Sequence, residues 1–174
     1  MNYTKEQAIE ILERTPAVLS TLLSGISDDW VMNNEGAETF SPYDVVGHLI
    51  HGEKTDWVVR AKLILEHGTA KPFEPYDRFA QYEESKGKSL QQLLDEFDEI
   101  RKRNIAWFQS CQVTEEDLER KGMHPVLGEV SLRNLLSTWV VHDLTHIAQV
   151  TRVMAKQYKG EMGPWPEFFR ILQF

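Results

Sequence analysis

The chain has 174 residues, of which 41% are hydrophobic and 26% are charged, which is the usual composition of a globular protein with a buried core. Its 27 acidic and 19 basic residues give a net charge of −8, which argues against a nucleic-acid-binding surface because such surfaces need basic patches. The length fits a single domain over residues 1–174.

Cysteine usage and apolar runs indicate the compartment. Cys111 is the only cysteine, so no intrachain disulfide can form and nothing indicates an oxidising environment. The first residues lack the basic segment and apolar stretch of a signal peptide, and no apolar run approaches the ~20 residues of a membrane span. We therefore expect a cytoplasmic protein without membrane contact.

The first helix is expected to begin after Thr4. Gln7 follows Thr4 by three residues, which is a capping-box pattern, and the apolar residues over 8–23 have helical spacing. Pro16 interrupts this pattern, so we expect a kink or a break there. Residues 24–40 are predicted to form a loop.

The second helix is expected to begin at Ser41 and Pro42, with serine as the N-cap and proline at the first helical position. Its apolar positions continue to about Gly68, which is a C-cap candidate. Residues 69–88 hold two prolines and few apolar residues, so they predict a long connection. Long connections in compact domains are often functional.

The third and fourth helices each follow a serine. Ser89 precedes an apolar stripe that ends before a second long connection over residues 112–130. Ser131 precedes the fourth helix, with Gly160 expected just past its end and a short terminal helix expected over 167–172. No convincing strand pattern is present.

These elements predict an all-α protein. Four long helices with long connections and a short C-terminal helix indicate a four-helix up-down bundle. The core of such a bundle is a usual place for a metal site.

The strongest chemical signal is the pair His142 and His146 on the fourth helix. Residues four apart lie only about 40° apart around a helix and one turn along it, so both imidazoles can reach one ion. The pair sits among apolar neighbours and is predicted to face inward. Buried imidazoles must each find a hydrogen-bond partner or a ligand. Two histidines that bind one metal ion satisfy this requirement, and so do two histidines that only form hydrogen bonds within the core.

His48 on the second helix is the predicted third ligand, because it aligns with the apolar stripe of that helix. Gly47 beside it would allow a close helix approach, and Asp44 one turn earlier is a candidate acceptor for its ring. His51 follows by three residues and is a rival ligand.

Other residues near these positions have two interpretations each. Glu53 lies either at the mouth of the bundle or on a solvated face, and Gln149 is either a hydrogen-bond partner of the site or a core amide. Asp143 gives the pair a distant similarity to the His-Glu-x-x-His motif of zinc proteases, but it points about 100° away from His142. No catalytic residue is assigned.

The chain resembles the DinB-like superfamily, also called the YfiT-like metal-dependent hydrolases. The resemblance is carried by residues 41–49 with Glu53, by residues 124–132 and by residues 139–149. It implies a four-helix bundle, a three-histidine site for nickel, zinc or a similar divalent ion, and a homodimer.

The family positions map onto His48, His142 and His146, and all three ligands are present. Characterised members include bacillithiol S-transferases and mycothiol-dependent isomerases. The resemblance therefore implies a metal-dependent hydrolase or low-molecular-weight-thiol S-transferase acting on a small electrophile. The alternative is a non-catalytic metal-binding module of a stress response. No thiol-recognition residues are identified, so the substrate stays open.

Overall fold

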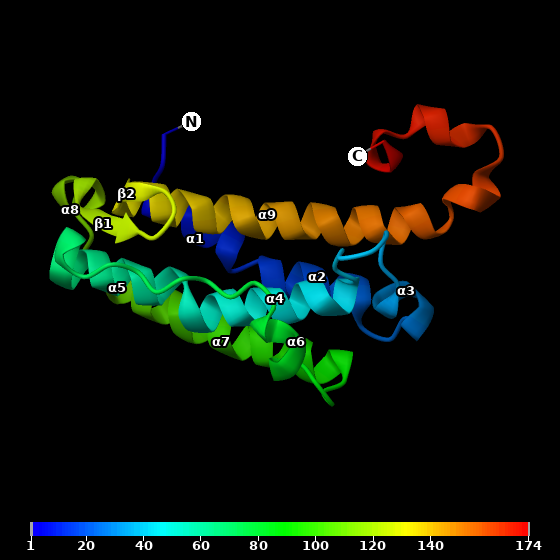
Figure 1. Cartoon of the computed structure of the whole chain (residues 1–174), viewed down its shortest axis with the longest axis horizontal. Helices are drawn as coiled ribbons and strands as arrows, with labels where there is room; N and C mark the ends of the chain where they lie inside the picture. The colour runs from blue at the N-terminus through cyan, green and yellow to red at the C-terminus, as the bar shows by residue number, and fades with distance from the viewer. Residues whose placement is uncertain (1, 174) are drawn as a thin grey trace.

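The structure is a computed structural model that describes residues 2–173. Its long helices pack side by side along one direction as a four-helix bundle (Figure 1). The four bundle helices are α1 (Lys5–Leu12) with α2 (Thr15–Leu23), α4 (Pro42–Thr55) with α5 (Trp57–His67), α7 (Leu90–Ser110) and α9 (Leu132–Gln157). The predicted all-α class is confirmed.

Two of the bundle helices are interrupted. The first breaks at residues 13–14, and Pro16 lies in the first turn of α2, where its missing N–H removes no helical hydrogen bond. This break was predicted. The second interruption is at Asp56, whose backbone angles (φ −110°, ψ −82°) lie outside the helical region. No proline or glycine stands at this position, so the sequence gives no direct signal for it.

Serine caps fix where the bundle helices begin. The side chains of Ser41, Ser89 and Ser131 each accept a hydrogen bond from the backbone N–H three residues later, as predicted. The Asp44 carboxylate completes the first cap by accepting hydrogen bonds from the backbone N–H and the hydroxyl of Ser41. At the other end of this helix, Gly68 adopts a positive φ of 59°, a conformation that favours glycine.

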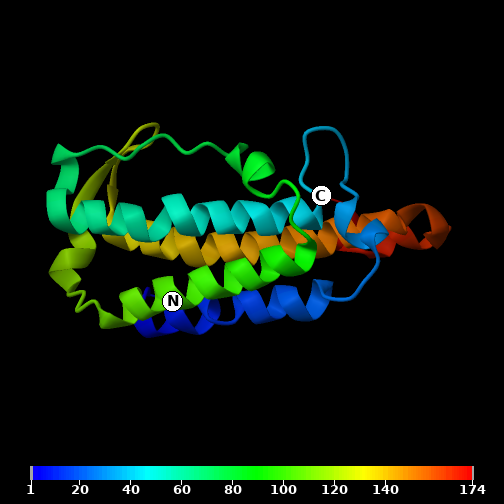
Figure 2. The same ribbon diagram turned by 90° about the horizontal axis from the view of Figure 1, so that it is seen from below.

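The four bundle helices run up, down, down and up in chain order, rather than in simple alternation (Figure 2). Residues 68–89 travel back along the length of the bundle, so α7 begins beside the start of α4. The Tyr43 hydroxyl near the start of α4 donates to the backbone oxygen of Lys88. Further along both helices, Asn104 donates to the backbone oxygen of Glu53. We call residues 68–89 the crossover.

The connections contain short elements. These are α3 (Asp28–Met32), η1 (Gly68–Ala70), α6 (Ala80–Glu84), α8 (Glu115–Glu119), β1 (Lys121–His124) and β2 (Gly128–Ser131). The two strands pair antiparallel. The expectation of no strands was wrong here, because four-residue strands are too short to show an alternating pattern.

The C-terminal segment consists of 3-10 helices: η2 (Lys159–Met162), η3 (Trp165–Phe168) and η4 (Arg170–Leu172). The short terminal helix expected over 167–172 is therefore divided at Phe169. Gly160 lies within η2, and Tyr158 is the C-cap of α9.

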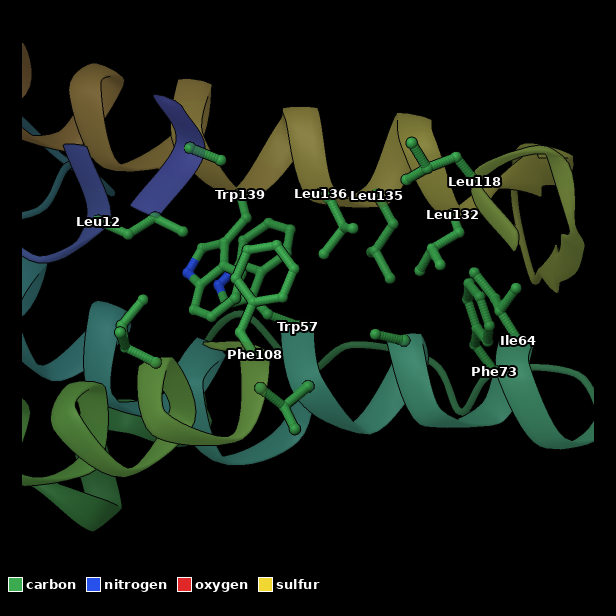
Figure 3. Close-up of a cluster of buried hydrophobic side chains, with 14 residues drawn as sticks. Leu12, Trp57, Ile64, Phe73, Phe108, Leu118, Leu132, Leu135, Leu136 and Trp139 are labelled. Atoms are coloured by element: carbon green, nitrogen blue, oxygen red, sulfur yellow. The ribbon is translucent and has the colours of Figure 1, made fainter. Parts of the chain in front are cut away.

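One apolar core lies toward the hairpin end of the bundle (Figure 3). Trp139 is fully buried in this core, and its ring stacks on Trp57 at a centroid distance of 6.2 Å. Leu12, Phe108 and Leu136 pack into the same cluster. Burying side chains of this size stabilises a fold by roughly 1.5–3 kcal/mol each.

A second apolar core surrounds Phe97 and includes Leu23, Val46, Ile50 and Val150. Along α4 with α5, along α7 and along α9, buried polar residues lie between the positions that contribute to the two cores. The middle of the bundle is therefore a polar layer. None of the helices described here has both the length and the apolar character needed to cross a membrane.

Candidate metal centre

Three histidines meet in the polar layer. The Nε2 atom of His142 lies 3.1 Å from Nε2 of His48 and 3.1 Å from Nε2 of His146. One ring nitrogen from each histidine lies within 4.8 Å of the other two. The structure thus brings together the three predicted ligands, and we call this group the histidine cluster.

His51, the rival candidate, faces elsewhere. Its Nδ1 lies 2.9 Å from a carboxylate oxygen of Glu84 in α6. The close packing of α6 against α4 depends on Gly47, because a Cβ at that position would lie 2.4 Å from the Ser85 hydroxyl oxygen. The predicted role of Gly47 in helix approach is therefore correct, and the helix that approaches is α6.

Two of the three imidazoles have a hydrogen-bond partner at Nδ1, the ring nitrogen that points away from the cluster. The Tyr76 hydroxyl in the crossover lies 3.2 Å from Nδ1 of His48. The Gln149 amide oxygen lies 2.8 Å from Nδ1 of His146 and can only accept, so this nitrogen carries the proton. Nδ1 of His142 is buried without a hydrogen-bond partner among residues 2–173. Asp44, expected beside His48, instead caps α4.

Burial keeps the cluster uncharged at neutral pH. Desolvation, followed by repulsion from His146, lowers the pKa of His48 to about 3 and that of His142 to about 2. Desolvation also lowers the pKa of His146, although its hydrogen bond to Gln149 and the charge of Asp143 act in the opposite direction. Neutral imidazole is the form that binds metal ions.

The donor set fits a divalent cation. Because His146 carries its proton on Nδ1, the lone pair of its Nε2 points toward His142. A single N–H on His142 cannot satisfy two facing nitrogens fully. In a zinc site each histidine nitrogen lies about 2.0–2.1 Å from the ion, and two such nitrogens are then about 3 Å apart. The 3.1 Å spacing of the nitrogens here matches that arrangement. The three histidines could therefore bind a divalent metal.

A second buried group lies beside the histidines and consists of Glu53, Arg101 and Asp143; we call it the ion cluster. The Arg101 guanidinium donates to Glu53 at 2.8 Å and to Asp143 at 3.0 Å, and it also donates to the backbone oxygen of Leu12. Burial alone would lower the pKa of Arg101, but the charges of Asp143 and Glu53 outweigh burial and raise it.

The ion cluster changes the interpretation of two predicted residues. Glu53 is not on a solvated face: it is buried, and its carboxylate also accepts hydrogen bonds from Asn104 and Trp139. Asp143 is fully buried and held by Arg101, so it does not serve as the general base of a zinc-protease motif. Arg101 was not predicted, although it lies four residues after Phe97 on the inner stripe of α7.

A cavity of about 320 Å³ opens beside the histidine cluster. His48 and His146 form part of its wall, and the loop before α4, the crossover and α9 supply the rest. The lining residues are Glu35, Glu38, Thr39, Phe40, His48, Arg78, His146, Gln149 and Arg152. A small molecule could therefore approach the histidines from this side.

His67, His124 and Cys111 are not members of the histidine cluster. The His124 ring accepts hydrogen bonds from the backbone N–H groups of Val126 and Leu127 in the hairpin turn. His67 ends α5 beside Glu66.

The fold and the site define a four-helix-bundle protein with a buried three-histidine candidate metal centre. The sequence model described as the DinB superfamily matches residues 11–150. The chain belongs to this superfamily, as the sequence motifs indicated. Among curated proteins, none matches the chain.

Two solved structures are similar to this chain. YfiT from Bacillus subtilis is 25% identical, with a TM-score of 0.75 over 90% of this chain and 93% of its own. It is described as a probable metal-dependent hydrolase with an unusual four-helix bundle topology. The four-helix bundle protein TT2238 is 18% identical, with a TM-score of 0.57 over 85% of this chain and 98% of its own. The second likeness supports the fold alone.

Proposed function

We propose that this chain is a cytoplasmic, divalent-metal-dependent enzyme that acts on a small electrophile, as a hydrolase or as a low-molecular-weight-thiol S-transferase. The observation that carries the proposal is the convergence of His48, His142 and His146 without a fourth candidate ligand in residues 2–173. Three-histidine sites with an open position are typical of catalytic metals, whereas structural sites are closed by a fourth protein ligand.

Nickel and zinc are the metals we propose, since imidazole ligands suit both. A bound ion would polarise the electrophile and lower the pKa of a thiol or water at the open position. The protein holds the imidazoles neutral, orients His146 through Gln149, and provides the cavity that admits the substrate. The likeness to YfiT supports the hydrolase alternative.

The near-complete burial of two of the three imidazoles favours a second candidate function, a non-catalytic metal-binding module of a stress response. His48 and His146 are less than one-tenth exposed. A site that encloses its ion on all sides would serve stability or sensing rather than turnover.

Elemental analysis of the purified protein tests metal binding. The wild type should contain one equivalent of nickel or zinc, and His48→Ala should lose it. His51→Ala is a matched control, because His51 lies three residues away and pairs with Glu84, and it should retain the metal. Retention of stoichiometric metal by His48→Ala would contradict the assignment.

Turnover separates the enzyme from the module. The nickel-loaded and zinc-loaded proteins should conjugate low-molecular-weight thiols to electrophiles or hydrolyse small esters. Full metal content without turnover on either substrate panel would favour the non-catalytic module.

We also propose a homodimer, which the family resemblance implies. The outer face of α9 leaves Val141 and Leu144 exposed, and exposed apolar groups of this kind are common at protein interfaces. Light scattering coupled to gel filtration should give twice the chain mass of 20.2 kDa. A monomer at all concentrations tested would exclude this arrangement.

A further inference from the structure

The cavity beside the histidine cluster contains one cation that no carboxylate of residues 2–173 pairs with. This cation is Arg78 in the crossover. Its guanidinium lies over the ring of Phe79, at 4.9 Å from the centroid, and 5.8 Å from the ring of Phe40. Packing on aromatic rings positions a guanidinium while leaving N–H donors available for another partner.

The other guanidinium of the cavity is already engaged. Nε of Arg152 lies 3.1 Å and 3.2 Å from the two carboxylate oxygens of Glu35, and Lys156 pairs with the same carboxylate at 2.8 Å. The hydrogen bond from Arg152 is the largest contribution to the lowered pKa of Glu35. Arg152 is therefore a fixed part of the wall, and Arg78 is the cation available to a ligand.

Other charges around the cavity limit the kind of anion that would bind. Glu38 also lines the cavity, and no cation of the described chain pairs with it. Because Arg152 and Lys156 already pair with Glu35, Glu38 is the carboxylate that would repel a doubly charged phosphate more than a singly charged carboxylate. Arg78 lies near the histidines, because the centroid of the Phe40 ring is 5.8 Å from its guanidinium and 5.5 Å from the centroid of the His48 ring.

We propose that Arg78 is a specificity-determining residue that binds the carboxylate of a small anionic substrate whose reactive end lies at the histidine cluster. This inference rests on the proposed function and adds the substrate class. A guanidinium can bind both oxygens of a carboxylate through two parallel hydrogen bonds. Phe40 provides an apolar wall for the methylene groups between the carboxylate and the reactive end.

Cobalt(II) is a spectroscopic probe for the test, because a thiol that binds the ion changes its absorption. The cobalt-loaded protein is titrated with 3-mercaptopropionate and with its uncharged analogue, 3-mercaptopropionamide. We expect the wild type to bind the carboxylate about tenfold more tightly than the amide, since a hydrogen bond to a charged group has about that effect.

The preference for the carboxylate should depend on Arg78. Arg78→Gln should bind the two thiols equally, and Arg78→Lys should retain part of the preference because it keeps the charge without the planar fork. Glu38→Gln should strengthen carboxylate binding by removing a like charge. Arg103→Gln is the matched control, since Arg103 is exposed on α7 away from the cavity, and it should keep the full preference.

Equal binding of the two thiols by the wild type would overturn the role of Arg78 and leave the proposed function standing. If Arg78→Gln weakens the binding of both thiols equally, at unchanged cobalt content, the role of Arg78 would also be overturned. If neither thiol changes the cobalt spectrum, then both the open metal position and the anionic substrate are excluded.

Discussion

The two polar clusters in the middle of the bundle use their hydrogen-bonding groups in opposite ways. In the ion cluster, the carboxylate oxygens of Glu53 and Asp143 accept hydrogen bonds from Arg101, Asn104 and Trp139. In the histidine cluster, ring nitrogens face other ring nitrogens. In the first cluster every carboxylate oxygen is satisfied by the protein itself, and only Nε of Arg101 is left without a partner among residues 2–173. The second cluster needs a ligand that the protein does not supply.

This difference indicates that the two clusters have different roles within the polar layer. The ion cluster joins α4, α7 and α9 and fixes their relative positions. Unmet polar groups at a functional site lower the stability of the fold and are retained for their activity. The histidine cluster has this character, so mutations should affect stability in one cluster and metal binding in the other.

The largest effect is expected for Arg101→Met. Removing the guanidinium leaves Glu53 and Asp143 buried without their cation, and breaking a buried ion pair in this way costs about 3–5 kcal/mol. The free energy of unfolding should be measured by urea denaturation of the metal-free protein. Arg103→Met, on the exposed side of the same helix, should change it by less than about 0.5 kcal/mol. A loss below about 1 kcal/mol for Arg101→Met would show that the ion cluster does not hold the bundle.

The next effect concerns the partner of His48. Tyr76→Phe removes the hydroxyl beside Nδ1, and loss of such an outer partner typically weakens metal affinity about 10- to 100-fold. Competition with a chelator of known affinity would measure it. Tyr82→Phe is the control, because Tyr82 lies in α6 against Phe40 rather than against a histidine. Equal metal affinities of Tyr76→Phe and the wild type would show that Tyr76 does not support metal binding by His48.

The pH dependence of stability should also distinguish the clusters. The folded pKa values of His48, about 3, and His142, about 2, lie below the ~6.5 of an unfolded histidine. The unfolded chain therefore takes up protons first as the pH falls below about 6.5, and the metal-free protein loses stability. The loss should reach about 1.4 kcal/mol per pH unit for each histidine.

Urea denaturation at pH 7, 6 and 5 measures this slope. Asp56 acts in the opposite direction, because burial raises its pKa to about 6, so the slope is best compared between the wild type and His142→Leu. The variant should show the shallower slope. Identical slopes would mean that His142 titrates normally in the folded protein.

The smallest effect is expected for the stability of metal-free His142→Leu at pH 7. This substitution removes a buried nitrogen without a partner and fills the space with an apolar side chain, so the free energy of unfolding should stay within about 1 kcal/mol or rise. Thermal and urea unfolding would measure it, alongside complete loss of metal. A loss above about 2 kcal/mol would show that the histidine cluster stabilises the fold without an ion.

Local sequence signals predicted a large part of the fold. The caps at Ser41, Ser89 and Ser131 and the break near Pro16 depend on neighbouring residues only, and they lie where expected. The spacing of His142 and His146 is likewise set within one helix turn. Choosing His48 over His51 needed one further step, the alignment with the apolar stripe, and the structure places His48 in the cluster.

Features that depend on distant contacts were not predictable in the same way. The parallel run of α4 and α7 follows from the path of the crossover, which has no periodic pattern. Tyr76 and Arg78 lie in this segment, so nothing in the sequence placed them near His48. Arg101 did leave a signal, because a charged residue on an apolar stripe requires buried partners.

The wide separation in sequence of the ligands has a consequence for how the chain unfolds. His48 and His142 are 94 residues apart, and they come from the first and second halves of the bundle. An ion held by both would act as a removable cross-link that closes a loop of this length. In the chain-entropy description, closing a loop of about 100 residues restricts the unfolded ensemble by up to about 4.7 kcal/mol. Loss of the ion would then lower the free energy of unfolding of the chain.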